Sequence, residues 1–144
     1  MKIALDLNVV LDVIQHRQPH YLDSAEVLSR IRTGEIAAIL PSHGVTTLWY
    51  ILNKAVNSAT ANQTVDWLVN HFEIGGANKA DFQAARMLPI TDFEDAVVAR
   101  LAQSANCDYI VTRNVSDFAG SPVPASTPTD FLKRLPAPAP PGET

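Results

Sequence analysis

The chain is poor in cysteine, and it has no long hydrophobic run. Cys107 is its only cysteine, which excludes an internal disulfide and a cysteine-based zinc site. Because Cys107 lies in an apolar segment, we interpret it as a small core residue rather than a reactive thiol. No apolar segment reaches the roughly 18 residues of a membrane span, and we recognise no signal peptide. We therefore expect a protein of the reducing cytoplasm, with no membrane partner.

Positive charge is also scarce. The chain has 11 Lys and Arg residues against 15 Asp and Glu residues, a net charge of −4. That balance argues against a protein that binds nucleic acid through a broad basic surface. It does not argue against an enzyme whose acidic side chains are neutralised by metal cations. With 144 residues, 47% of them hydrophobic, the chain fits one domain with a buried core.

Strand-like and helix-like hydrophobic patterns alternate along the chain. This alternation favours an α/β domain whose parallel sheet is covered by helices on both faces. We assign residues 1–135 to this domain and the proline-rich residues 136–144 to a disordered tail. Strands are predicted at 2–7, 35–40, 72–74, 108–112 and 123–125, and helices at 8–14, 21–32, 42–52, 60–72, 79–87, 92–105 and 129–135.

Acidic residues follow two of the predicted strands and begin one of the helices. Open α/β sheets bind their ligands beyond the carboxyl ends of the strands. Carboxylates that converge there repel one another, and a divalent cation relieves this repulsion. Oxygen ligands of this kind select magnesium or manganese. The residues are Asp6 after the first strand, Asn114 and Asp117 after the strand at 108–112, and Asp92, Glu94 and Asp95 at the start of a helix.

Several acids also have a structural interpretation. Asp92 is placed to cap a helix, and we favour that role for it. Two acids can have either a structural role or a role in the site. Asp95 lies near the third helical position, and Asp117 lies in a turn. Asp6 favours function, because it ends an otherwise apolar strand. Asp12 is interpreted as a solvated helix residue rather than a neighbour of the site.

Polar and aromatic residues near these acids have further roles to distinguish. Asn8 is expected to hold Asp6 or the backbone by hydrogen bonds, and Thr112 either does the same or simply ends a strand. His43, at a strand-to-helix turn, is expected at the surface rather than facing the site. Trp49 and its neighbour Tyr50 are expected in core or dimer contacts rather than in base stacking.

Segments along the chain resemble the motifs of PIN domains in their family order. Residues 42–50 also resemble a subgroup of bacterial PIN proteins similar to VapC toxins. The resemblance covers about residues 2–134 and implies a PIN-like three-layer α/β/α domain with a central parallel sheet. The matching segments are 5–12 for the opening motif, 92–96 for the central acidic helix, 109–118 for the third motif, and Thr127-Pro128 with Phe131-Leu132 for the usual ending.

The resemblance implies a magnesium- or manganese-dependent endoribonuclease that hydrolyses RNA phosphodiester bonds, commonly as the toxin of a type II toxin–antitoxin pair. Asp6 and Asp95 carry over as metal ligands, and Asp117, supported by Asn114, covers the last acidic position. For Arg113 two interpretations stay open: a contact to the RNA backbone, or an ordinary position on the surface. The implied partners are RNA, a cognate antitoxin and a second copy in a homodimer.

The chain departs from the family pattern at two positions. Many relatives have an aspartate where it has Asn114, and typical members have a glutamate where it has Leu48. Glu94 could turn inward to fill this gap, but its helical phase relative to Asp95 favours an outward position. A catalytically weakened PIN domain, acting as an RNA-binding or protein-interaction module, is therefore the alternative. An unrelated phosphatase using Asp6 as nucleophile is disfavoured, since Asn8 occupies the position of its second aspartate.

Overall fold

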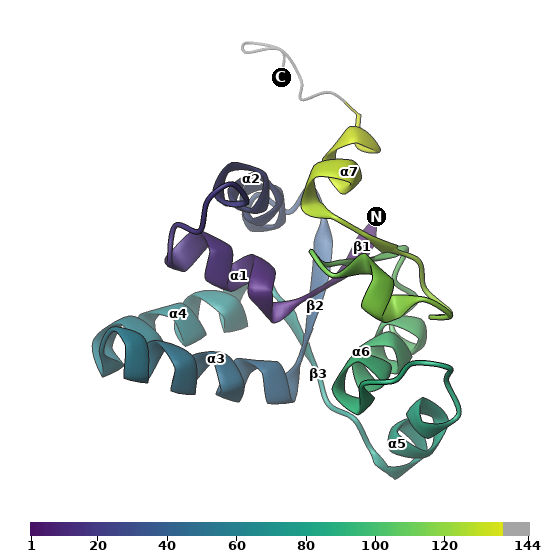
Figure 1. Ribbon diagram of the computed structural model, residues 1–144. Coiled ribbons are helices and arrows are strands. Elements are labelled where there is room, and N and C mark those ends of the chain that lie inside the picture. Colours follow the sequence, from purple (N-terminus) through teal and green to yellow (C-terminus); the bar gives the residue numbers. More distant parts are fainter. Residues whose placement is uncertain (137–144) are drawn as a thin grey trace.

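The computed structural model describes residues 1–136, so the predicted tail lies almost wholly outside the described residues. Five parallel strands form one sheet in the order β3-β2-β1-β4-β5, with helices packed on both faces (Figure 1). The predicted α/β class is confirmed. The strands are β1 (Lys2–Leu5), β2 (Ala37–Pro41), β3 (Glu73–Gly75), β4 (Tyr109–Val111) and β5 (Ala125–Ser126). The helices of the described part are α1 (Leu7–Ile14), α2 (Tyr21–Arg32), α3 (Ser42–Ala55), α4 (Ser58–His71), α5 (Lys79–Arg86), α6 (Phe93–Ser104) and α7 (Pro128–Lys133), with a 3₁₀ helix η1 (Val115–Phe118).

The order of the strands places β1 at the centre of the sheet. After β1 the chain builds outward through β2 and β3 on one side, then returns to build β4 and β5 on the other. Ile3 of β1 is paired with Ala38 of β2 and with Tyr109 of β4. The carboxyl end of the strand at which the chain changes sides is where open α/β sheets bind their ligands. Asp6 lies at that point, directly after β1.

Alternate residues of β1 pack into two different cores. Ile3 and Leu5 belong to the larger core, which the sheet shares with α1 to α4 and α7. Ala4 points to the opposite face, where it packs with Ala99 and Ala102 of α6. Small side chains on both sides of this contact let α6 approach the sheet closely. The close approach brings the first turn of α6 toward the end of β1.

Trp49 and Cys107, two residues outside the site, pack against the cores as predicted. Trp49 is half-buried against the larger core, and its Nε1–H donates to Asn62 Oδ1 at 2.8 Å, whereas Tyr50 is exposed. Cys107 is buried, and this burial raises the pKa of its thiol to about 11, so the thiol stays protonated at neutral pH. Within residues 1–136, no helix combines the length and hydrophobicity that a membrane crossing requires.

Leucine truncation tests how strongly α3 is packed against the sheet. Leu52 of α3 is 0% exposed, whereas Leu22 of α2 is 72% exposed. Leu52→Ala leaves a cavity in the core, and we expect it to lower the free energy of unfolding by about 2–5 kcal/mol. The same truncation at Leu22 is expected to change it by less than about 0.5 kcal/mol. Urea unfolding followed by circular dichroism measures both variants, and equal losses would contradict the packing described here.

Candidate functional site

Asp6 is held at the end of β1 by contacts from β4, from Thr112 directly after β4, and from α1. Its main-chain N–H donates to Val111 O of β4 at 2.9 Å. Its Oδ2 accepts a hydrogen bond from Thr112 Oγ1 at 2.7 Å, and its Oδ1 accepts from the main-chain N–H of Asn8 at 3.2 Å. The Asp6 side chain thereby caps α1. Asn8 contacts Asp6 through its backbone N–H, and of the two roles left open for Thr112 the structure shows the hydrogen bond to Asp6.

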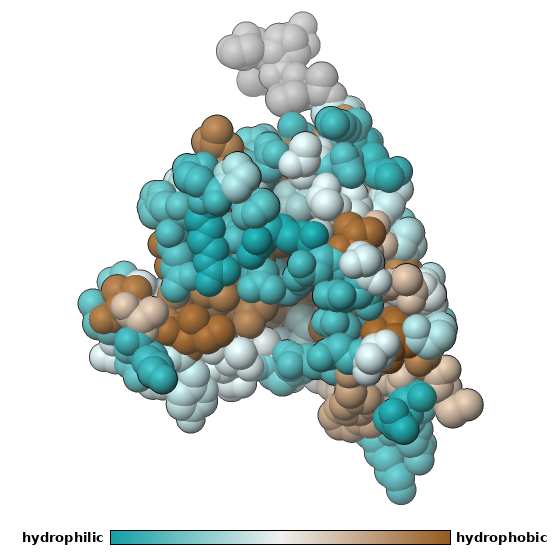
Figure 2. All heavy atoms as spheres, in the orientation of Figure 1, coloured by the Kyte–Doolittle hydropathy of each residue, from teal (hydrophilic) through white to brown (hydrophobic). Residues whose placement is uncertain are grey.

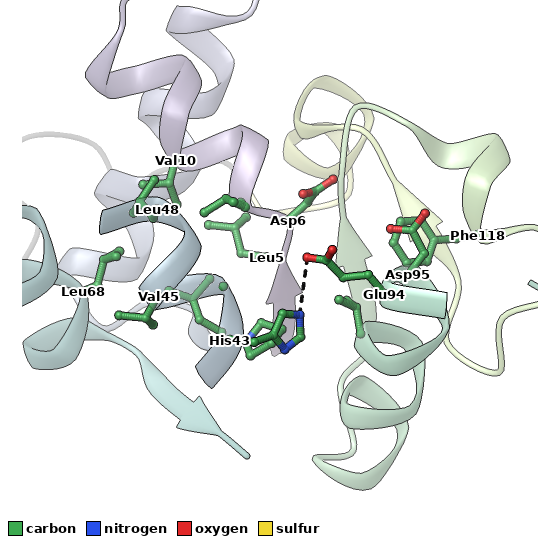
Figure 3. A pocket seen from close by; sticks show the side chains of 15 residues that line it. Leu5, Asp6, Val10, His43, Val45, Leu48, Leu68, Glu94, Asp95 and Phe118 are labelled. Atoms are coloured by element: carbon green, nitrogen blue, oxygen red, sulfur yellow. Dashed lines mark ion pairs between the residues drawn. The ribbon is translucent and has the colours of Figure 1, made fainter. Parts of the chain in front are cut away.

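The first turn of α6 presents further carboxylates to the same region. Asp92 caps the helix by accepting a hydrogen bond from the Asp95 N–H at 3.0 Å, which confirms its predicted role. Glu94, predicted to point away, instead lines a pocket together with Asp6 and Asp95. Its Oε1 lies 3.5 Å from Nε2 of His43, a residue predicted to face away from the site (Figure 3).

His43 lies here because it follows Pro41, the last residue of β2, by only two positions. The neighbouring strand β1 ends beside it, so the turn into α3 opens at the same edge as Asp6. Glu94 reaches this edge because it lies in the first turn of α6, where the side chain extends beyond the helix end. Helical phase alone gave no indication of this arrangement.

Asp117 reaches the site on η1, a short helix that the sequence analysis did not predict. Its N–H donates to Asn114 O at 3.0 Å, and the Asn114 N–H donates to Thr112 Oγ1 at 3.0 Å. The hydroxyl of Thr112 therefore connects the start of η1 to the carboxylate of Asp6. The predicted residues share one pocket of about 220 Å³, whose lining includes Asp6, Asn8, Asp92, Glu94, Asp95, Asn114 and Asp117.

Negative charge accumulates in this pocket. Burial, and then repulsion from Asp92, Asp6, Asp117 and Glu94, raises the pKa of Asp95 to about 6. Within residues 1–136, no ion pair joins Asp6, Asp95 or Asp117 to a lysine, arginine or histidine. The repulsion between these carboxylates is therefore not compensated by the protein itself.

The donors at this edge have the chemistry that magnesium and manganese require. Asp6, Asp95 and Asp117 offer carboxylate oxygens, and Asn114 offers an amide oxygen. Across the described chain, however, no three His, Cys, Asp or Glu side chains are gathered tightly enough to enclose a metal ion. On α3, the position of the usual family glutamate is Leu48, which is fully buried in the larger core.

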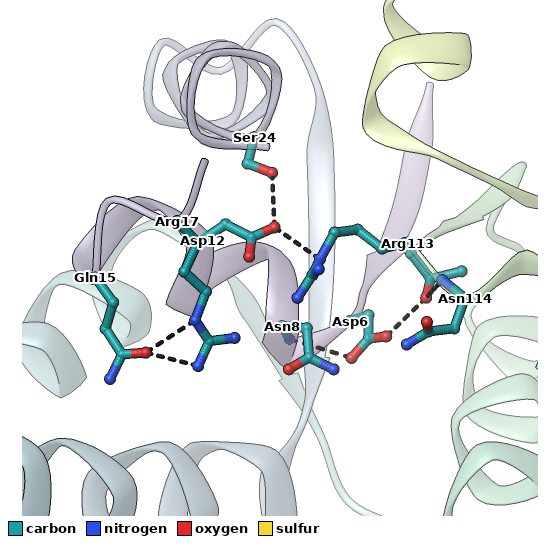
Figure 4. A network of polar contacts seen from close by, with 9 residues as sticks. Asp6, Asn8, Asp12, Gln15, Arg17, Ser24, Arg113 and Asn114 are labelled. Atoms are coloured by element: carbon teal, nitrogen blue, oxygen red, sulfur yellow. Dashed lines mark hydrogen bonds and ion pairs between the residues drawn. The ribbon is translucent and has the colours of Figure 1, made fainter. Parts of the chain in front are cut away.

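Asp12 and Arg113 take a different place from the one expected. Asp12 was expected to be solvated but is 0% exposed, because α2 packs over this face of α1. Its Oδ2 accepts a hydrogen bond from Ser24 Oγ of α2 and lies 3.0 Å from Nε of Arg113 (Figure 4). The Arg113 guanidinium is thus paired within the protein, and its contact to RNA stays a prediction.

The raised pKa of Asp95 makes protein stability depend on pH. Because folding raises this pKa from 3.8 to about 6, the contribution of Asp95 to stability is fully present below pH 3.8 and is lost as the pH rises through 6. Asp95→Asn cannot ionise, so with chelator present we expect it to be more stable than the wild type at pH 7.5. Allowing for solvent screening of this partly exposed group, the gain is about 1–2 kcal/mol.

Thermal unfolding at pH 4 and pH 7.5 measures this effect. The two proteins should converge at pH 4, where Asp95 is largely protonated in the wild type. Asp66→Asn, on the exposed face of α4, is the matched control and should show no such pH-dependent difference. A variant with Asp95→Asn that is equally or less stable than the wild type at pH 7.5 would contradict the predicted repulsion.

Three solved structures with similar folds were compared with the chain. It resembles a chain of VapBC2 from Rickettsia felis bound to a promoter DNA fragment, with 18% identity, a TM-score of 0.66, and coverage of 88% of this chain and 98% of that one. A chain of VapBC-1 from nontypeable Haemophilus influenzae gives 17% identity and a TM-score of 0.65, covering 90% and 99%. VapC20 of Mycobacterium tuberculosis, described as a sarcin-ricin loop cleaving toxin, gives 9% identity and a TM-score of 0.60, covering 75% and 86%.

These likenesses confirm the expected fold. No curated protein sequence matches the chain. A family model described as the PIN domain matches residues 2–116, which include the strands β1 to β4 and the residues Asp6, Asp95 and Asn114. The match covers most of the chain, and it agrees with the three-layer architecture and with the acidic edge of the sheet. The protein therefore belongs to the PIN domain family.

Proposed function

We propose that this protein is a magnesium- or manganese-dependent endoribonuclease of the cytoplasm, and that it acts as the toxin of a type II toxin–antitoxin pair. The observation that carries the proposal is the gathering of Asp6, Asp95 and Asp117 around one pocket with no cationic partner in the described residues. Membership of the PIN family and the fold shared with VapBC proteins support the same assignment.

Each acid has a separate task in this proposal. Asp6 is held rigidly by Thr112 and by the backbone of Asn8, so it fixes the position of the site on the sheet. Asp95 and Asp117 approach from α6 and η1, and they complete the set of oxygen ligands. When bound, a divalent cation supplies charge neutralisation at the scissile phosphate and activation of the attacking water. Asp117, which also lines a neighbouring pocket of about 530 Å³, would orient that water.

Glu94 offsets part of the charge that the chain lacks on α3. Its carboxylate lines the pocket that Leu48 also lines, and it extends from α6 toward Asp6 and His43 (Figure 3). In this pocket Glu94 is a third carboxylate beside Asp6 and Asp95, although it lies on α6 and not on α3. This observation favours an active enzyme over the weakened binding module, for which Leu48 and Asn114 are the supporting features.

Substitution of Asp6 tests the proposed activity. Asp6→Asn keeps the size of the side chain and the hydrogen bond to the backbone but removes the charge. We expect it to lower RNA cleavage on the order of 100-fold or more in the presence of magnesium or manganese. Cleavage of total RNA, measured with and without chelator, is the assay, and Asp66→Asn is the control of equal chemistry on α4. Cleavage by the Asp6→Asn protein at the wild-type rate would contradict the proposal.

Wild-type protein that binds RNA but does not cleave it under any of these conditions supports the binding module instead. Manganese titration by calorimetry separates this outcome from an assay that merely lacks the right RNA. An active nuclease binds manganese in the wild type and binds it more weakly with Asp6→Asn. A binding module that has lost its site shows no such difference.

We also propose a protein partner of the antitoxin class. An apolar groove of about 370 Å³ lies between α1, α2 and α4, and Figure 2 shows hydrophobic side chains gathered between α1 and the α3–α4 pair. Such a groove fits the apolar face of a partner helix. The groove is lined by Val10, Val13, Ile14, Ala25, Leu28, Ser29, Arg32, Gln63, Thr64 and Trp67. We propose a homodimer as well, to which the exposed Tyr50 is available.

A charge introduced into the groove tests the partner. Ala25→Asp places a carboxylate among apolar side chains, so we expect the product of an adjacent small reading frame to co-purify with the wild type but not with this variant. Leu22→Asp, on the exposed side of α2, is the control and should leave co-purification unchanged. If the Ala25→Asp protein still retained the partner, the groove would not be the binding site. Light scattering of the wild type tests the proposed homodimer independently.

A further inference from the structure

Asp12 and Arg113 form a buried ion pair beside the site but outside it. The Arg113 Nε lies 3.0 Å from Asp12 Oδ2, with side-chain exposures of 25% and 0%. Ser24 Oγ donates to the same oxygen at 3.2 Å, whereas Asp12 Oδ1 and Arg113 Nε are buried without a hydrogen-bond partner among the described residues, so the contact between the two side chains is one of charge. Because Asp12 is shielded from bulk solvent, its charge depends on Arg113, its one ion-pair partner among the described residues.

The pair joins two segments that each carry part of the site. Asp12 lies on α1, the helix that Asp6 caps. Arg113 lies in the connection between β4 and η1, directly between Thr112 and Asn114. Figure 4 shows Arg113 extending from this connection to Asp12 on α1, beside Asp6 and Asn114. The ion pair is thus a second side-chain contact between the region of α1 and the connection from β4 to η1, and it lies outside the pocket.

We propose that Asp12 and Arg113 are positioning residues that hold η1, and with it Asp117, in register with Asp6. This inference rests on the proposed nuclease function. Thr112 ties the connection to Asp6 through its hydroxyl and to Ser126 O of β5 through its N–H at 2.9 Å, and the ion pair adds a contact from Arg113 to α1. The positioning role also assigns Arg113 to the protein rather than to RNA, because its partner Asp12 has no exposed surface.

Removing either partner should have the same effect if the pair acts as a unit. Arg113→Met and Asp12→Asn are each expected to lower kcat and manganese affinity by about 10- to 100-fold, with KM for RNA nearly unchanged. The double variant should be no worse than either single variant, because the interaction is already lost. Arg113→Lys keeps the charge and should recover much of the manganese affinity. Arg100→Met is the matched control, since Arg100 makes a similar pair with Asp81 between α5 and α6.

Amide hydrogen exchange gives a measurement that needs neither metal nor RNA. The N–H groups of Asn114 and Asp117 should exchange faster in Asp12→Asn and Arg113→Met than in the wild type or Arg100→Met. Unchanged exchange there would overturn the positioning role even if the enzyme is active. If the wild type neither binds manganese nor cleaves RNA, the proposed function fails, and exchange still decides whether the pair holds η1.

The kinetic results separate positioning from RNA binding. A rise in KM with Arg113→Met, together with a weaker dependence on salt and unchanged kinetics for Asp12→Asn, would make Arg113 an RNA contact and overturn the proposal. The proposal would also be overturned if the double variant lost as much kcat and manganese affinity as the two single variants combined. Where a single variant fails to fold, the double variant, which leaves no unpaired buried charge, and Arg113→Lys supply the same comparison.

Discussion

Repulsion between carboxylates at the end of β1 is the constraint on which the rest of the site depends. Asp6, Glu94, Asp95 and Asp117 line one pocket, and repulsion from its neighbours helps to raise the pKa of Asp95. Contacts outside the pocket hold these four acids close together. Backbone pairing of β1 with β4 anchors Asp6, and the core formed by small residues draws α6 close to the sheet. The unfavourable charge is thus concentrated at one point and stabilised by neutral packing around it.

Stability and function oppose each other most directly at Asp95. Its ionised form is disfavoured by burial and by four neighbouring acids, and the same features make the pocket attractive to a cation. Binding a cation to the folded protein only would stabilise it, so the site and the fold are thermodynamically linked. A neutral residue here would improve the fold of the metal-free chain and remove the charge that a cation needs.

Local signals predicted the strands, the Asp92 helix cap and the place of Asp6, whereas the assignment of Asp95 and Asp117 to the site rested on the family resemblance. Apolar runs, helix caps and the position of Asp6 after a strand depend on neighbours in the chain, and each prediction agrees with the structure. The contacts that were missed join residues far apart. Asp12 pairs with Arg113 across 101 positions, and no local pattern distinguishes such an aspartate from a solvated one. The η1 helix was missed because one 3₁₀ turn has no periodicity to detect.

Glu94 shows how a site can keep its charge when a family position is lost. Leu48 is part of the larger core, so an acid at that position of α3 would have to be buried among apolar side chains. Glu94 instead projects from the first turn of α6, where it stays exposed to solvent and faces His43. A solvated carboxylate costs little in the absence of metal and can turn toward a cation when one arrives. With the acid on α6, the packing of Leu48 in the core is separate from the charge that Glu94 brings to the pocket.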